Sequence, residues 1–160
     1  MYLDGLSFLE DEREAWRPYE ALDTLSDDQL SRPVEAAHGW SGRDLMAHLV
    51  GWQEEALAAA RELAVRETSA SFERMDAIDW DDGEGDAVND DILARYRAMP
   101  ISDVRRRFRE TAGELRGYLT VVPETRWVKN AHHLSNFLGE TLEHYADHTG
   151  DLEAILAAGR

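Results

Sequence analysis

Two histidines near the end of the chain have a spacing that suits metal binding. His144 and His148 are four residues apart, so in a helix both side chains project from one face, about one turn apart. Two imidazoles at this separation can share a metal ion. Phe137 and Ile155 on the same stripe indicate that this face points toward the protein interior or its mouth. Because burying an unpartnered imidazole is costly, the pair must share a metal ion, a carboxylate or water.

A third histidine lies on the core side of an earlier segment with helical periodicity. His48 falls between Leu45 and Trp52 on the apolar stripe of that segment. Packing of the helices side by side can therefore bring His48 opposite His144 and His148. Three neutral imidazoles with open coordination positions suit a divalent transition metal, Zn, Ni, Fe or Mn, that keeps room for a substrate. The alternative interpretation is a water-filled polar pocket without a metal.

Several carboxylates share the face of the terminal histidine pair. Glu140 lies one turn before His144, and Asp151 lies about one turn after His148. Such groups can orient an imidazole, act as a base on bound water, or replace a histidine as ligand. Glu140 is the candidate catalytic group among them, whereas Asp147 is interpreted as solvated surface.

The elements that position these residues are predicted to be helices. Apolar residues recur at helical spacing, and no convincing alternating strand occurs. The predicted helices cover roughly 3–24, 41–67, 88–98, 102–122 and 135–159. Pro18 breaks the first, and Ser41, Ser102 and Ser135 are the predicted N-caps of three others. An antiparallel four-helix bundle is the simplest way to bury every stripe, so we predict an all-α fold with residues 1–160 as a single domain.

The connections between these helices carry the remaining histidines and an acidic segment. His38, His132 and His133 fall in predicted loops, where exposed histidine is common. Residues 75–91 contain eight acidic residues and no basic residue, so we predict a long solvated loop over 76–91. A calcium-binding loop of the EF-hand type is excluded. Ala87 occupies the position that requires Gly, and Leu93 occupies the position that requires a bidentate Glu.

The composition excludes several functional classes. The chain contains no cysteine, so disulfides, thiolate metal sites and a cysteine nucleophile are excluded, and any thiol must come from a substrate. A net charge of −16 repels phosphate backbones and anionic lipid, so neither nucleic acid nor a membrane is an expected partner. The chain has no run of roughly 20 apolar residues, and its N-terminus is acidic where a signal peptide would be basic. These features predict a cytoplasmic protein.

Two motifs resemble a known superfamily. The segment Gly39–Trp52 (GWSGRDLMAHLVGW) and the segment His144–Leu152 (HYADHTGDL) are similar to the DinB/YfiT-like superfamily, and the resemblance covers nearly the whole chain. In that superfamily one histidine of the second helix and two of the last form a metal triad near one end of a four-helix bundle. The resemblance therefore assigns the ligand positions to His48, His144 and His148.

The resemblance also implies chemistry on small molecules. Characterised relatives include thiol-dependent transferases and the N-terminal domain of mycothiol-dependent maleylpyruvate isomerase. This sequence ends just after its last predicted helix, without the C-terminal domain of that isomerase, so the isomerase reaction itself is not carried over. The colibactin self-resistance proteins, which are not built around a metal triad, form a second similar branch. That similarity rests on Gly51-Trp52, Val88–Asp90 and His144–His148.

The preferred hypothesis is a divalent-metal-dependent enzyme of the thiol S-transferase type that acts on a small molecule. The metal would bind a low-molecular-weight thiol or water and lower its pKa, so that the anion attacks an electrophile. One alternative is a metal-free binding or resistance hydrolase of the colibactin self-resistance type, and another is a non-enzymatic helical module. Trp52 and Tyr145 are candidate pocket walls or core residues, and a homodimer through exposed helix faces is a further expectation.

Overall fold

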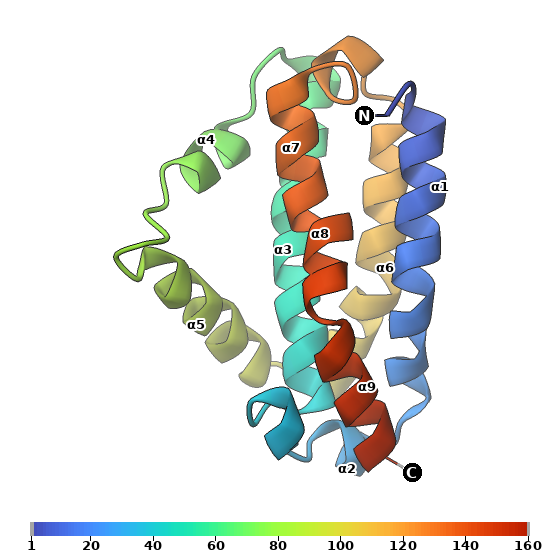
Figure 1. The fold of residues 1–160 in the computed structure, drawn as a ribbon, viewed down its shortest axis with the longest axis vertical. Coiled ribbons are helices and arrows are strands. Elements are labelled where there is room, and N and C mark those ends of the chain that lie inside the picture. Colours follow the sequence, from blue (N-terminus) through green and yellow to red (C-terminus); the bar gives the residue numbers. More distant parts are fainter. Residues whose placement is uncertain (1, 160) are drawn as a thin grey trace.

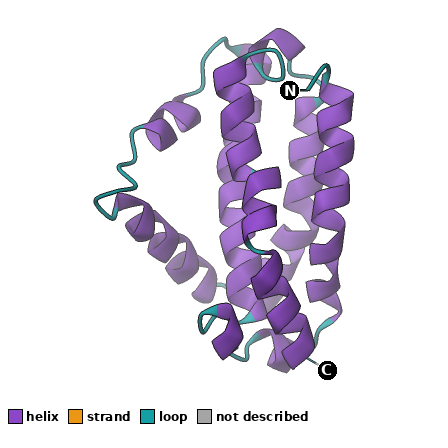
Figure 2. Ribbon diagram, in the orientation of Figure 1, coloured by secondary structure: helices purple, strands orange, loops and turns teal. Residues whose placement is uncertain are grey.

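The computed structural model describes residues 2–159, and over that range its elements are all helices joined by loops, without a strand (Figures 1 and 2). The longest elements run side by side along the molecule, and we call them the core helices (Figure 1). They are α1 (Gly5–Trp16), α3 (Gly42–Val65), α6 (Ile101–Leu119) and a C-terminal run of α7 (Ala131–Glu140), α8 (Leu142–Asp147) and α9 (Thr149–Ala158). The all-α prediction is confirmed. Within residues 2–159, no helix combines the length and apolar character needed to cross a membrane.

Helix α3 is the central element, and its start is set by the sequence. The Ser41 side chain accepts a hydrogen bond from the Asp44 amide, and the Asp44 carboxylate accepts one from the Ser41 amide. This reciprocal capping box confirms the predicted cap. Since α3 packs against α6, α7 and α9, several of its faces are buried, and both His48 and Trp52 lie on buried positions.

Two predicted caps are wrong, because each helix begins earlier than expected. Helix α6 follows Pro100, so Ser102 lies in its first turn. Helix α7 is capped by Asn130, whose side chain accepts a hydrogen bond from the His133 amide at 3.1 Å, so Ser135 lies inside the helix. The pair of histidines predicted to lie in a loop therefore occupies the first turn of α7.

The last predicted helix is broken twice. At Thr141 the hydroxyl donates a hydrogen bond to the Phe137 carbonyl at 2.6 Å, which is a contact that bends helices. At His148 the chain leaves the helical path again before α9 begins. The segment between the two breaks, α8, can consequently take an orientation of its own.

The acidic segment is more helical than predicted. Helix α4 (Ala70–Asp76) and helix α5 (Glu84–Arg97) extend into it from both sides, so the predicted loop over 76–91 is wrong and only residues 77–83 connect the two helices. We call α4, α5 and their connection the arm, which stands beside the core helices in Figure 1. The arm forms helices because it buries apolar side chains, namely Phe72, Met75, Ile92, Leu93 and Tyr96.

Two further features explain the position of α5. Glu84 and Asp86 lie in its first turn, where the helix dipole favours negative charge. Ile92 packs against Gly51 of α3, where a Cβ would come within 2.4 Å of the Ile92 side chain. The close approach of the arm to α3 therefore requires a glycine on α3.

The first core helix continues into irregular structure, as predicted from Pro18. Helix α1 passes into a 3-10 helix at Arg17–Thr24 with this proline in its first turn. A short helix, α2 (Asp27–Leu30), and a second 3-10 helix at Glu35–Ala37 then lead to α3. These short elements cover the end of the molecule at which α9 also finishes (Figure 1).

A buried polar cluster joins four of the core helices. Glu12 on α1 is 1% exposed, and it accepts hydrogen bonds from Tyr145 on α8 at 2.9 Å and from Arg116 on α6 at 2.6 Å. The Tyr145 hydroxyl accepts a third bond, from Gln53 on α3, at 2.8 Å. These partners offset the cost of burying a charged pair. The cluster fixes α8, the helix between the two breaks, against α1, α3 and α6.

Candidate functional site

The three histidines predicted as ligands lie together between α3 and the C-terminal run. One ring nitrogen from each of His48, His144 and His148 lies within 4.8 Å of the other two. Nε2 of His48 and Nε2 of His144 are 2.7 Å apart. The ring centroid of His148 is 4.6 Å from that of His48 and 5.0 Å from that of His144. Three potential ligand atoms therefore surround one small volume.

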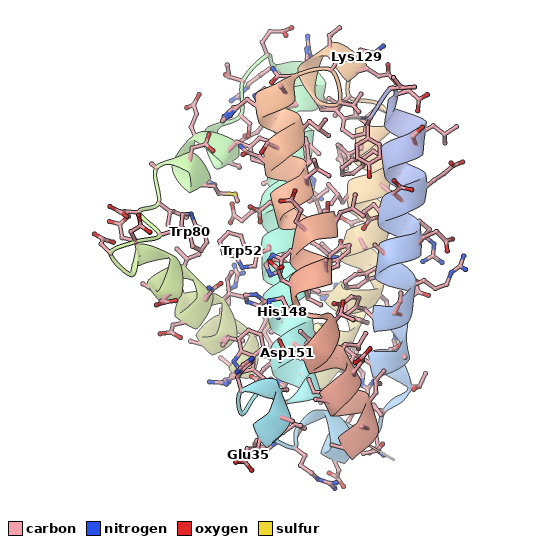
Figure 3. All side chains as sticks on the ribbon, viewed as in Figure 1. Glu35, Trp52, Trp80, Lys129, His148 and Asp151 are labelled. Carbon is pink, nitrogen blue, oxygen red and sulfur yellow. The ribbon has the colours of Figure 1, made fainter. Side chains whose placement is uncertain are left out.

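Two contacts set the orientation of the His148 ring. Nδ1 of His148 lies 2.8 Å from a carboxylate oxygen of Asp151, which is itself buried (Figure 3). The indole of Trp40 stacks on the same imidazole, with centroids 5.6 Å apart and planes 21° apart. Because Nδ1 is engaged by the carboxylate, Nε2 is the nitrogen left to face the other histidines. Asp151 thus has the orienting contact that its spacing in the sequence suggests.

Burial keeps two of the histidines neutral. Loss of hydration, with smaller contributions from the neighbouring histidines, lowers the pKa of His48 to about 3. Loss of hydration, with repulsion from His148, likewise lowers the pKa of His144 to about 3. Metal binding requires deprotonated imidazoles, so at neutral pH both rings are in the required state. The set of three imidazole donors fits a divalent transition metal such as Zn, Ni, Fe or Mn.

A cavity of about 340 Å³ opens beside these histidines. It is lined by His48, Trp52, Trp80, Asn89, Gly139, Glu140, His144, Asp147 and His148. Figure 3 shows Trp80 at the turn between α4 and α5, directed toward Trp52 on α3. The cavity is therefore enclosed by three parts of the fold, which are α3, the arm and the C-terminal run. Tyr145, the other candidate wall, faces the buried polar cluster instead.

Glu140 is the last residue of α7, directly before the break at Thr141. Burial, reinforced by repulsion from Glu55, raises the pKa of Glu140 from 4.5 to about 8. Its Oε2 is shielded from solvent and has no hydrogen-bond partner among the described residues. A carboxyl group with this pKa keeps its proton at neutral pH and can donate it within the cavity. Glu140 does not belong to the three-histidine group itself.

Asp147 combines exposure with a position at the cavity. Its side chain is exposed, in agreement with the interpretation as solvated surface, but it also contributes to the cavity lining. The carboxylate therefore adds negative charge at the cavity mouth.

Two lining residues, Trp80 and Asn89, are not predicted from the sequence as site residues. Both lie in the segment predicted to be a solvated loop, and only the folding of the arm against α3 brings them to the cavity. Asn89 holds Trp52 in place, because its Oδ1 accepts a hydrogen bond from Trp52 Nε1 at 2.9 Å. A lone tryptophan within an acidic stretch was the available signal, since large apolar side chains rarely stay in a solvated loop.

The remaining histidines do not join the cluster. His132 pairs with Asp76 of α4 at 2.8 Å, and Nδ1 of His133 lies 2.6 Å from the Arg126 carbonyl. His38 is exposed, with its Nε2 3.7 Å from Asp151. The structure therefore separates three histidines that share the cavity from three that make contacts outside it.

Comparison with known proteins gives one family assignment. Residues 9–153 match the family model described as the mycothiol maleylpyruvate isomerase N-terminal domain. No curated protein and no solved structure matched the chain. The matched range contains His48, Glu140, His144 and His148, so it includes the whole candidate site.

Proposed function

The chain belongs to the mycothiol maleylpyruvate isomerase N-terminal domain family, a DinB/YfiT-like family, and from this premise we propose that it is a divalent-metal-dependent enzyme of the thiol S-transferase type. The observation that carries the proposal is the convergence of three histidines beside a cavity. The substrates are a small electrophile and a low-molecular-weight thiol, which must be supplied because the chain has no cysteine. As part of the proposal, the core helices form an antiparallel four-helix bundle within a single domain of residues 1–160.

The histidines are the proposed metal ligands. His48, His144 and His148 would hold a Zn, Ni, Fe or Mn ion, whose charge lowers the pKa of a bound thiol or water. Asp151 keeps the His148 ring in position through its contact with Nδ1. Trp40 covers a face of the same ring and limits its contact with water.

Glu140 is the proposed proton donor. Because burial raises its pKa to about 8, the carboxyl group is protonated at neutral pH. As the thiol sulfur forms a bond to the electrophilic carbon, an electron pair moves onto the atom that becomes anionic, and Glu140 donates its proton to that atom. The proton lost by the thiol passes to bulk water, and water later returns a proton to Glu140. The proton count is therefore unchanged over a cycle.

The metal content of protein purified without an affinity tag tests this proposal. We expect about one transition-metal ion per chain, a stoichiometry that follows from a single three-ligand site. The double variant His144→Ala with His148→Ala should lose this ion. His132→Ala, which removes an exposed histidine outside the cluster, should keep it, and circular dichroism should show that both variants are folded. Stoichiometric metal in the double variant would place the metal site elsewhere.

A metal-free hydrolase is the second candidate function, and one contact favours it. The 2.8 Å contact between His148 and Asp151 is the arrangement of a histidine base oriented by a carboxylate, which can activate water without a metal. Hydrolysis of an ester or a strained electrophile in the presence of a chelator, without any thiol, would support this candidate. Loss of all turnover on chelation would support the metal-dependent enzyme. A protein with neither metal nor turnover would correspond to a non-enzymatic helical module.

A further inference from the structure

Apart from its three histidines, the cavity is lined mainly by acidic and aromatic side chains. Glu140 and Asp147 contribute two carboxyl groups from the C-terminal run, and Trp52 and Trp80 contribute two indoles. Among the described lining residues there is no lysine or arginine. A negatively charged substrate group would therefore find no lysine or arginine to pair with in this lining.

Trp80 is held in place although much of it is exposed. Its side chain is 56% exposed, which is unusual for so large an apolar group. Gly85, at the start of α5, packs directly on the indole, and a Cβ at Gly85 would come within 2.1 Å of the Trp80 ring. The ring is thereby fixed beside Trp52, with their centroids 5.7 Å apart (Figure 3).

Trp52 is fixed as well, and the two indoles make a corner. The Asn89 side chain accepts a hydrogen bond from Trp52 Nε1, which prevents the indole from rotating. The planes of the two indoles are inclined by 38°. Indole faces carry negative electrostatic potential, and a cation within about 6 Å of the ring centroid is attracted to them. Two indoles and the Asp147 carboxylate around one cavity are thus complementary to an organic cation.

We propose that the electrophilic substrate carries an ammonium group, which binds against Trp52 and Trp80 and close to Glu140 and Asp147. The inference rests on the proposed function, because it takes the cavity beside the histidines to be the substrate site. An anionic electrophile, such as the maleylpyruvate in the family's name, would gain no attraction from the Asp147 carboxylate or from the two indole faces.

Choline and its uncharged isostere, 3,3-dimethylbutan-1-ol, test the preference for a cation. Each is titrated into the protein while tryptophan fluorescence and heat of binding are followed, in parallel for metal-loaded and chelator-treated samples. We expect choline to quench the fluorescence and to bind about tenfold more tightly than the isostere in the chelator-treated sample, and by a smaller factor in the metal-loaded sample, where the charge of the ion opposes a second cation. Equal affinities for the two compounds, or tighter binding of the dianion maleate to chelator-treated protein, would overturn the proposal.

Substitutions of Trp80, the tryptophan of the arm, test whether choline binds at this cavity. Trp80→Leu should weaken choline binding about five- to tenfold, whereas Trp80→Phe, which keeps an aromatic face, should retain part of the affinity. Tyr118→Leu removes a partly exposed aromatic ring on α6, away from the cavity lining, and should leave choline binding unchanged. Unchanged binding in both Trp80 variants, with native circular dichroism, would also overturn the proposal.

The two proposals fail in different ways. If the protein prefers choline but takes up no metal when metal is supplied, the proposed function is wrong and the cation site stands. Protein that binds metal and transfers a thiol without preferring the cation would contradict the cation site alone.

Discussion

His48 supplies one ring nitrogen from α3, and His144 and His148 supply two from the C-terminal run, so a metal held there keeps coordination positions for a substrate. We predict that a low-molecular-weight thiol enters one of these positions. When cobalt-substituted protein is titrated with bacterial thiols, a new charge-transfer band should appear in the near-ultraviolet absorption spectrum, because a thiolate ligand produces one. The corresponding alcohols serve as controls and should not produce this band.

The same experiment distinguishes a thiol from water as the nucleophile. His48→Ala should lose both the band and the thiol-transfer activity, because it removes one of the three imidazoles. If no thiol perturbs the cobalt spectrum while a simple ester is hydrolysed without thiol, bound water is the nucleophile and the transferase function is wrong.

The second prediction at the residue scale concerns Glu140 and pH. Burial raises its pKa in the folded protein from 4.5 to about 8, so between these values the unfolded chain releases a proton that the folded chain retains. The free energy of unfolding should therefore fall as pH rises from about 4.5 to about 8. Glu140→Gln removes the ionisation and should stabilise chelator-treated protein at pH 8 by on the order of 1–4 kcal/mol, with little effect at pH 4.5.

Urea denaturation at several pH values measures this difference. Glu143→Gln, at an exposed position on α8, is the matched control and should change stability by less than about 0.5 kcal/mol at each pH. If the stability difference between Glu140→Gln and the unmodified protein does not vary with pH, Glu140 is not held protonated by burial.

At the scale of elements, α8 depends on the polar cluster for its position between two helix breaks. Tyr145→Phe removes a hydroxyl that donates to Glu12 and accepts from Gln53, so both groups lose a buried partner. We predict a loss of about 1–3 kcal/mol in the free energy of unfolding. Because His144 and His148 flank Tyr145, we also predict weaker metal binding in the folded variant.

Chemical denaturation gives the first quantity, and competition with a metal indicator gives the second. Tyr118→Phe is the control, because it removes a phenolic hydroxyl from a partly exposed position on α6. If Tyr145→Phe loses stability but binds metal as tightly as the unmodified protein, the cluster stabilises the fold without positioning the ligands.

At the scale of the whole molecule, one apolar cluster connects the described elements. It extends from Phe8 on α1 to Ile155 on α9, and it includes Phe72 and Tyr96 from the arm. Because the arm shares this core, we predict a single cooperative transition in urea that coincides when followed by far-UV circular dichroism and by tryptophan fluorescence. A separate early change in fluorescence would mean that the arm unfolds on its own and that the core helices form the only cooperative unit.

The sequence by itself determined the helical class and the candidate ligands, because both depend on local spacing. His144 and His148 are close enough in the chain to share a face, and His48 lies on an apolar stripe whose start is set by the Ser41 capping box. The breaks at Thr141 and His148 do not separate the ligand pair, since the short α8 segment preserves their spacing. Helical periodicity and the capping motif are therefore sufficient to predict the helical class and the three candidate ligands.

Only the tertiary structure decided what surrounds the histidines. Folding of the arm against α3 brings Trp80 and Asn89 to the cavity, although the acidic composition of their segment predicts a solvated loop. Packing of α8 turns Tyr145 toward Glu12, and burial at the end of α7 raises the pKa of Glu140. Each of these outcomes depends on contacts between segments far apart in the chain, and on the loss of water that such contacts cause, which local spacing does not encode.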